Sequence, residues 1–142
     1  MVYVSRKEYF NAAHKLYNEH WTKEQNDEVF GPCANEHWHG HNFELIVTIK
    51  GTTIPEVGWV MDMKKLGKLI RENITDKLDH RNLNIDVDFL RNTQPTCENV
   101  VIKCWEILFP LIPIHSENRA TLYSIQLHET HKNFVEYRGE NG

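Results

Sequence analysis

Hydrophobic and polar residues alternate in two long stretches near the N-terminus, and each stretch predicts a β-strand. In residues 2–14 one parity holds Val2, Val4, Phe10, Ala12 and His14. In residues 38–50 the alternation is clearer, and one face holds His39, His41, Phe43, Leu45, Val47 and Ile49. Because successive side chains of a strand point to opposite faces, we expect each set to share one face of a sheet. Residues 15–37 between them form a long connection without a clean period.

Two helices and two further strands are predicted in the rest of the chain. The first helix runs from a cap at Asp62 to about Leu78, and its apolar stripe has helical spacing. Thr96 caps the second helix, which ends at Pro110. Residues 120–129 alternate again, and residues 133–137 form a short last strand. The face predicted for 120–129 holds Tyr123, Ile125, Leu127 and Glu129.

The predicted order β-β-α-α-β-β separates the strands from the helices along the chain. That separation is typical of an α+β fold in which both helices cover one face of an antiparallel sheet. Such a sheet has two open edges, and open edges must be covered or paired. We therefore expect several copies of the chain to associate edge to edge into a homo-oligomer.

Length and composition fit one globular domain over residues 1–142. Of the 142 residues, 40% are hydrophobic and 25% are charged, which excludes wholesale disorder. A net charge of −4 argues against nucleic acid as a partner. The longest apolar run, near 107–114, contains two prolines and is too short to cross a bilayer, so no membrane partner is expected. Three cysteines and an N-terminus without an apolar signal core predict a cytoplasmic protein.

Histidine is the one compositional excess, and the sequence His39-Gly40-His41 is its clearest pattern. At the start of an alternating strand, both imidazoles lie on one face and are close enough to share a metal ion. His14 ends the matching face of the first strand, next to His39 if the two strands pair antiparallel. Three imidazoles suit a catalytic Zn²⁺ site, which keeps a fourth position open. The alternative is three ordinary surface or packed histidines.

Other histidines and one acid compete less well for this site. His37 has the same parity as His39, but Trp38 and the irregular loop before it indicate that the strand is not yet regular there. His128 has the opposite parity to Glu129 and is expected to face away from it. Glu44 lies too near the His-x-His pair, and on the other face, to complete a cupin-type metal site.

A cysteine near the histidines is a candidate for acid–base chemistry. Cys33 lies six residues before His39, and a thiolate near a cation can act as a base or a nucleophile. Cys97, at the start of a helix, is an intermediate case, whereas Cys104 lies on the apolar stripe and is expected to be buried. The alternative for Cys33 is also a small buried hydrophobic residue.

Two further acidic groups stand out. Asp79 could orient His80 in a proton-relay pair if both lie in a turn; the alternative is a helix C-terminal histidine favoured by the helix dipole. Glu129 continues an apolar strand face, so it lies at a rim or in a pocket. A carboxylate there can accept two parallel N–H donors from a flat ring such as a pterin or guanine.

Taken together, these residues resemble the 6-pyruvoyl-tetrahydropterin synthase family, which includes the similar 6-carboxytetrahydropterin synthases. The matching segments are FNAAH (10–14), FGPCANEHWHGHNFEL (30–45), LDHRNLN (78–84), PTCENV (95–100) and LHET (127–130). They follow the family order over nearly the whole chain. The resemblance implies the T-fold, in which sheets of several subunits close into a barrel, commonly a hexamer of two trimers with active sites between subunits.

The same resemblance assigns roles to individual residues. It implies that His14, His39 and His41 bind zinc and that Cys33 is the general base. Asp79 and His80 then form the relay pair, and could act on Cys33 of a neighbouring subunit. Glu129 anchors the pterin ring, and Thr96 lies in the segment that lines the pterin pocket. The sequence departs from the family pattern at Cys97, where Thr, Ser or Ala is usual.

The function implied is a zinc-dependent lyase that converts 7,8-dihydroneopterin triphosphate to 6-pyruvoyl-tetrahydropterin with loss of triphosphate. The Cys33-to-His39 spacing favours this biopterin-type product. Pro95-Thr96 instead resembles the bacterial enzymes, so a 6-carboxytetrahydropterin synthase of queuosine biosynthesis is the alternative. From another class, a non-catalytic oligomer that binds zinc or a pterin also stays open, and a fourth permanent protein ligand would favour it.

Overall fold

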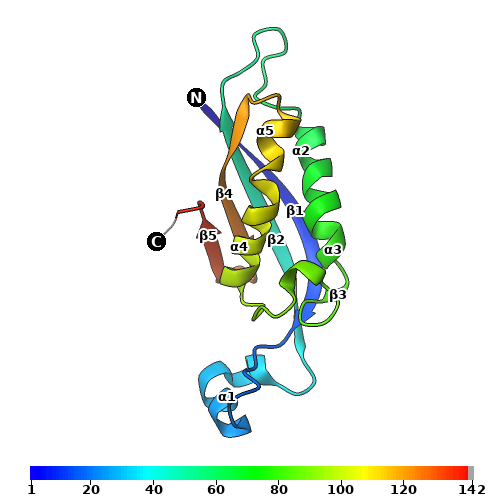
Figure 1. Ribbon diagram of the computed structural model, residues 1–142, viewed down its shortest axis with the longest axis vertical. Helices are drawn as coiled ribbons and strands as arrows, with labels where there is room; N and C mark the ends of the chain where they lie inside the picture. The colour runs from blue at the N-terminus through cyan, green and yellow to red at the C-terminus, as the bar shows by residue number, and fades with distance from the viewer. Residues whose placement is uncertain (141–142) are drawn as a thin grey trace.

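A computed structural model describes residues 1–140, and its strands and helices form two layers (Figure 1). The strands form one sheet in the order β3-β1-β2-β4-β5. Their bounds are β1 (Val2–His14), β2 (His39–Gly51), β3 (Arg81–Asn82), β4 (Ala120–His128) and β5 (Phe134–Tyr137). All neighbours are antiparallel except β3, which pairs parallel with the end of β1 at Ala12 and Ala13. The α+β class and the four predicted strands are confirmed, and β3 is an addition.

The helices lie largely on one face of this sheet. Their bounds are α1 (Lys23–Phe30), α2 (Met63–Ile70), α3 (Asp76–Leu78), α4 (Cys97–Leu108) and α5 (Leu111–His115), with short 3₁₀ turns at Gly31–Ala34 and Asp88–Leu90. A π-helical turn, Arg71–Thr75, joins α2 to α3, so the helix predicted over 62–78 is continuous but not regular. None of the helices among the described residues is long and apolar enough to span a bilayer.

Two predicted caps fix where the main helices begin. The side chain of Asp62 accepts a hydrogen bond from the backbone N–H of Lys64 at 2.9 Å. Thr96 accepts one from the backbone N–H of Asn99 at 3.2 Å. Such side chains satisfy N–H groups that have no partner within the helix. The cap at Thr96 therefore sets the first turn of α4, which lies against the candidate site.

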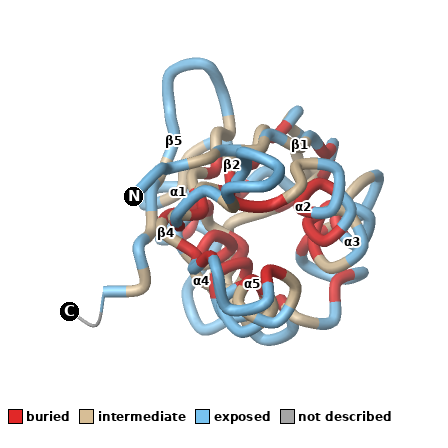
Figure 2. The backbone as a smooth tube through the Cα atoms, turned by 90° about the horizontal axis from the view of Figure 1, so that it is seen from above, coloured by how far each residue is buried: buried red, intermediate tan, exposed pale blue. Residues whose placement is uncertain are grey.

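The hydrophobic core fills the space between the sheet and the helices α2 to α5 (Figure 2). The inner face of β2 supplies Phe43, Leu45, Val47 and Ile49, all at most 1% exposed. The helices supply Leu66, Ile70, Ile74, Val100, Cys104 and Leu108. Alternation along β2 thus separates a buried face from an outer face, as its sequence predicts. The histidines at its N-terminal end continue the buried face.

The face predicted for residues 120–129 is partly wrong. A bulge shifts the register between β2 and β4 at Thr48 and Ile49, so one extra residue of β4 is accommodated there. A bulge reverses the alternation between the two faces of the sheet. Residues before it therefore face the side opposite to the one extrapolated from residues after it. Tyr123 consequently lies on the outer face, with its ring centroid 4.6 Å from that of Tyr3. Beyond the bulge, Ile125 and Leu127 point into the core as expected.

The connection predicted over 15–37 holds an ordered helix rather than an irregular loop. Thr22 and Gln25 form a reciprocal capping box at the start of α1. The buried amide of Asn26 donates to the carbonyls of Asn18 and Thr22. Figure 1 shows α1 at the end of the molecule where β1 ends and β2 begins. The segment that contains this helix reverses the direction of the chain, so that the end of β1 and the start of β2 lie side by side.

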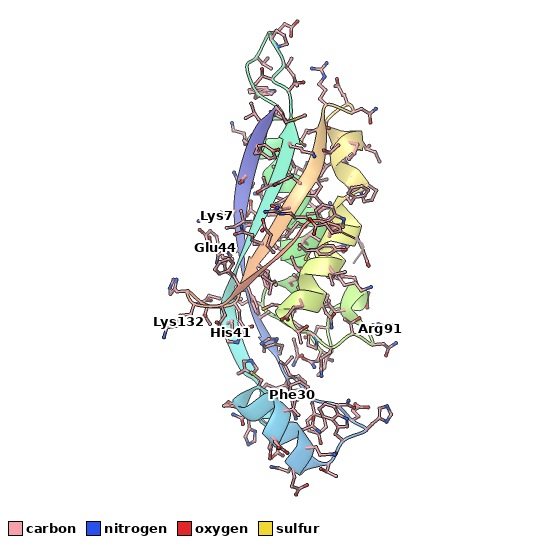
Figure 3. All side chains as sticks on the ribbon, turned by 90° about the vertical axis from the view of Figure 1, so that its left-hand side faces the viewer. Lys7, Phe30, His41, Glu44, Arg91 and Lys132 are labelled. Carbon is pink, nitrogen blue, oxygen red and sulfur yellow. The ribbon has the colours of Figure 1, made fainter. Side chains whose placement is uncertain are left out.

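The outer face of the sheet and most of one edge carry no covering element among residues 1–140. On the outer edge of β1, strand pairing is confined to Ala12 and Ala13. The outer face is largely polar: Lys7 and Glu44 form an ion pair with 2.8 Å between Nζ and Oε1 (Figure 3). An unpaired edge of this length invites pairing with another chain. Open sheet edges are the feature from which a homo-oligomer is expected, and this edge of β1 is one of them.

Candidate active site

Three histidines meet where β1 ends and β2 begins. In the antiparallel register His14 lies opposite His39, and Ala12 opposite His41. The period of two then places all three imidazoles on the buried face. Their ring centroids are 4.4 Å apart for His14 and His39, 4.9 Å for His39 and His41, and 5.2 Å for His14 and His41. The structure thus brings together the three residues singled out from the sequence.

His37 does not join this group. Trp38 adopts a left-handed backbone conformation with φ 69°, which is uncommon for a residue with a side chain. The turn interrupts the alternation immediately before His39, so His37 loses the shared parity. His37 is exposed and lies outside the cluster of metal-competent side chains.

The ring nitrogens of the cluster are arranged as metal ligands require. His14 Nδ1 lies 2.9 Å from the carbonyl oxygen of Pro95, so Nδ1 carries the proton and Nε2 keeps its lone pair. His14 Nε2 and both ring nitrogens of His39 are buried without a hydrogen-bond partner. Metal-bound histidines usually donate their second N–H to such a carbonyl. Buried nitrogens without partners are otherwise costly, so the donor set fits a metal ion.

The protonation of these rings also suits metal binding. Burial lowers the pKa of His14, His39 and His41, because it penalises the charged imidazolium. All three rings are therefore neutral at neutral pH. Only a neutral imidazole offers a lone pair to a metal ion.

Glu129 completes the group from the adjacent strand end. One ligand atom from each of His14, His39, His41 and Glu129 can be chosen so that all lie within 4.8 Å of one another. Glu129 Oε1 is 3.0 Å from His41 Nε2, and both side chains are partly buried. The sequence places Glu129 on the same side of β4 as Leu127, but its closeness to the histidines comes only from the structure. The carboxylate is thus next to the candidate metal site and also open to a ligand.

Cys33 lies in the 3₁₀ turn that precedes β2. Its carbonyl oxygen accepts a hydrogen bond from the backbone N–H of Leu16 at 2.9 Å, which fixes it just beyond His14. Burial, and secondarily the charge of Glu129, raise the pKa of its thiol. In one isolated chain Cys33 is therefore a protonated thiol. A role as a base requires a nearby cation or a proton acceptor.

Asp79 and His80 lie together just before β3, against the outer edge of β1 at Asn11. The backbone N–H of Asn11 donates to Asp79 Oδ1 at 2.8 Å, and His80 Nδ1 is 3.0 Å from Asp79 Oδ2. The left-handed conformation of His80, with φ 58°, lets these neighbours face each other. The bond from Asn11 and the contact with His80 lower the pKa of Asp79. The His80 side chain is 83% exposed, so the pair does not join the cluster within one chain.

Two cavities flank Glu129. One, of about 370 Å³, is lined mainly by the start of α4 and the β4–β5 connection, including Cys97, Lys132 and Phe134. The other, of about 510 Å³, lies on the outer face beside Tyr9 and His128. Figure 3 shows His41 and Lys132 at the end of the sheet nearest α1. Thr96 adjoins the first cavity through Cys97. A flat ring that reaches Glu129 has room on either side.

His128 and Cys104 lie outside the cluster of metal-competent side chains. His128 stacks on Phe134 with centroids 4.5 Å apart and faces away from the histidine cluster, as its parity predicts. Cys104 is fully buried, which raises the pKa of its thiol to about 12.

One contact of the site was missed by the sequence reasoning. The thiol of Cys97 donates to Glu129 Oε2 at 2.9 Å. The sequence signals were the position of Cys97 on the first turn of a capped helix and its departure from the family pattern.

The chain is similar over nearly its full length to proteins of one family. The family model "6-pyruvoyl tetrahydropterin synthase" matches residues 3–140. The 6-pyruvoyl tetrahydrobiopterin synthase of Homo sapiens is 38% identical over 137 residues, covering 96% of this chain and 91% of the human protein. That of Dictyostelium discoideum is 39% identical over 139 residues, covering 98% and 97%. The structure of the Caenorhabditis elegans 6-pyruvoyl tetrahydropterin synthase superposes with a TM-score of 0.87 at 38% identity, covering 98% and 96%.

Proposed function

The chain belongs to the 6-pyruvoyl tetrahydropterin synthase family, and on that basis we propose that it is a lyase acting on 7,8-dihydroneopterin triphosphate. The products are 6-pyruvoyl-tetrahydropterin and triphosphate. The curated relatives carry the name of this pyruvoyl-forming activity. Because the similarity covers nearly the full length of both chains, it favours this product over the carboxy alternative.

The metal of the proposed enzyme is Zn²⁺, held by His14, His39 and His41. The observation that carries this assignment is the set of buried ring nitrogens without partners that converge from two strands. Imidazole nitrogens suit zinc, and three of them leave a position for substrate. Once bound, zinc supplies Lewis-acid polarisation of the hydroxyl groups on the substrate side chain. Glu129 is the group that could also reach the ion. Its second contact, with the thiol of Cys97, favours a role in binding the pterin ring instead.

The protein residues then divide the work of binding and proton transfer. Glu129 accepts the parallel N–H donors of the pterin ring, the arrangement that a carboxylate makes with arginine. Thr96 fixes the helix start that lines the ring cavity. Cys33 removes the proton from C1′ of the side chain. Loss of that proton sets up departure of triphosphate and the internal redox step that yields the tetrahydropterin.

Asp79 and His80 are proposed to assist Cys33 from a neighbouring subunit. Within one chain the pair bonds to Asn11 on the outer edge of β1, which is unpaired over most of its length, and His80 is mostly exposed to solvent. Pairing of such edges closes the sheets into a barrel, for which we propose a hexamer of two trimers. Each site would then combine Cys33 of one chain with His80 of the next. The three free cysteines fit a reducing cytoplasmic location.

The test of the function is the identity of the product. Purified zinc-loaded protein is incubated with 7,8-dihydroneopterin triphosphate. The products are then separated, and their masses are determined by mass spectrometry. We expect triphosphate and a tetrahydropterin that keeps all three side-chain carbons. A one-carbon carboxy product would instead identify the 6-carboxytetrahydropterin synthase activity. Recovery of unchanged substrate would leave a non-catalytic zinc or pterin-binding oligomer.

Shared active sites predict complementation between two inactive variants. Cys33→Ala and His80→Ala chains, co-expressed with different tags and purified as mixed oligomers, are expected to regain activity that neither has alone. The reason is that some sites receive an intact Cys33 and an intact His80 from different chains. Light scattering coupled to size-exclusion chromatography first establishes the oligomer. Mixed oligomers without any regained activity, or a stable monomer, would contradict the shared site.

A further inference from the structure

Three consecutive residues before and at the start of α4 contact both parts of the candidate site. The carbonyl oxygen of Pro95 holds His14 through its Nδ1 at 2.9 Å. The side chain of Thr96 caps α4. The thiol of Cys97 donates to Glu129 Oε2 at 2.9 Å. One rigid helix start therefore contacts a proposed metal ligand on one side and the proposed pterin anchor on the other.

The backbone around Cys97 is fixed independently of its thiol. Asn99 contributes twice, since its backbone N–H donates to the Thr96 hydroxyl at 3.2 Å and its side chain donates to the Gln94 carbonyl at 2.9 Å. Cys97 itself is 8% exposed and buried against the core. The thiol is therefore presented to Glu129 from a position that the loop cannot easily change.

The orientation of the Glu129 side chain depends more on its contacts than that of Cys97 does. It follows the last residue of β4, and its backbone N–H bonds to the carbonyl of Asn133 at 3.1 Å in the turn to β5. Its carboxylate spans two environments: Oε2 meets the thiol of Cys97, and Oε1 lies 3.0 Å from His41 Nε2. The Cys97 contact is the only hydrogen bond to this carboxylate among the described residues. Loss of that bond would free the carboxylate to rotate out of this orientation.

We propose that Cys97 is a positioning residue that holds the carboxylate of Glu129 in the orientation that binds the pterin ring. The proposal rests on the proposed function, because it concerns the same ring site. A carboxylate has about four lone-pair positions, so Glu129 can accept from Cys97 and from two ring N–H groups together. Fixing its rotation before the substrate arrives lowers the entropy lost on binding. Cys97 thus acts on substrate affinity through Glu129 and touches no reacting atom.

The expected result separates binding from turnover. In Cys97→Ala, KM for 7,8-dihydroneopterin triphosphate is expected to rise roughly two- to tenfold, the range for loss of an ordinary hydrogen bond, because a thiol is a weak donor. The limiting rate kcat should change far less, because Cys33 is untouched. Cys97→Ser keeps an O–H donor at the same place and should restore most of the affinity. Cys104→Ala is the matched control, since it deletes a thiol of the same helix that does not contact Glu129.

A double-mutant cycle tests the route through Glu129. Binding of neopterin to the full-length protein is followed by its fluorescence in the unsubstituted protein, Cys97→Ala, Glu129→Gln and the double variant. We expect coupling, with little further loss from Cys97→Ala once Glu129 is changed. Additive losses, or an unchanged KM in Cys97→Ala, would overturn the proposal. Absence of both turnover and pterin binding in the unsubstituted protein would instead overturn the proposed function.

Discussion

Replacing Cys33 by alanine is expected to lower turnover roughly 10²–10⁴-fold, the usual contribution of a general base. The fold should survive, because the backbone of this segment is held by the bond from Leu16 N–H to the Cys33 carbonyl, which the substitution keeps. The thiol itself is only partly buried, so its loss leaves no large cavity. Steady-state rates with 7,8-dihydroneopterin triphosphate measure the effect.

Two controls distinguish a base from a structural thiol. Zinc content and the thermal midpoint of Cys33→Ala should match those of the unsubstituted protein. Cys104→Ala removes a thiol from the core and should keep its turnover while losing some stability. Retention of most activity in Cys33→Ala would contradict the role of general base. Loss of zinc together with activity would show that Cys33 is a permanent metal ligand.

Replacing His39 by alanine is expected to remove the metal and with it nearly all activity. Both ring nitrogens of His39 are buried without a protein partner, so little besides metal binding is lost. The zinc affinity should fall by more than about a hundredfold, since losing even an outer hydrogen-bond partner of a ligand costs 10–100-fold. Metal analysis of the purified variant and titration with a fluorescent zinc indicator measure this change.

His37→Ala is the matched control for the metal site. It also removes an imidazole from the segment before β2, but His37 is exposed and outside the cluster. Its zinc content and turnover should equal those of the unsubstituted protein. In addition, removing the metal with a chelator should abolish activity, and added zinc should restore it. An active His39→Ala variant with full zinc content would show that the cluster is not the metal site.

The main layers of the fold could be predicted because local patterns determine them. Alternation along residues 38–50 separates core from outer face, and Asp62 and Thr96 mark helix starts by their side-chain chemistry. The histidine cluster followed from the same alternation plus antiparallel pairing. These features depend on neighbours in the sequence or on the simplest pairing of two strands.

What the sequence did not reveal depends on tertiary contacts. The bulge that moves Tyr123 to the outer face is a register shift between two strands that no local pattern marks. The helix α1 has a capping box but a weak apolar stripe, so the polar segment looked irregular. Cys97 and Glu129 are 32 positions apart in the sequence. Their bond appears only when α4 packs against β4.

Three imidazoles are proposed to hold a zinc ion whose remaining position stays available to the substrate. X-ray absorption at the zinc edge of the purified, substrate-free protein identifies the atoms bound to this ion and their distances. We expect three imidazole nitrogens at about 2.0–2.1 Å with oxygen as the only other neighbour, and no sulfur. A sulfur shell at about 2.3 Å, or fewer than three imidazoles, would contradict it.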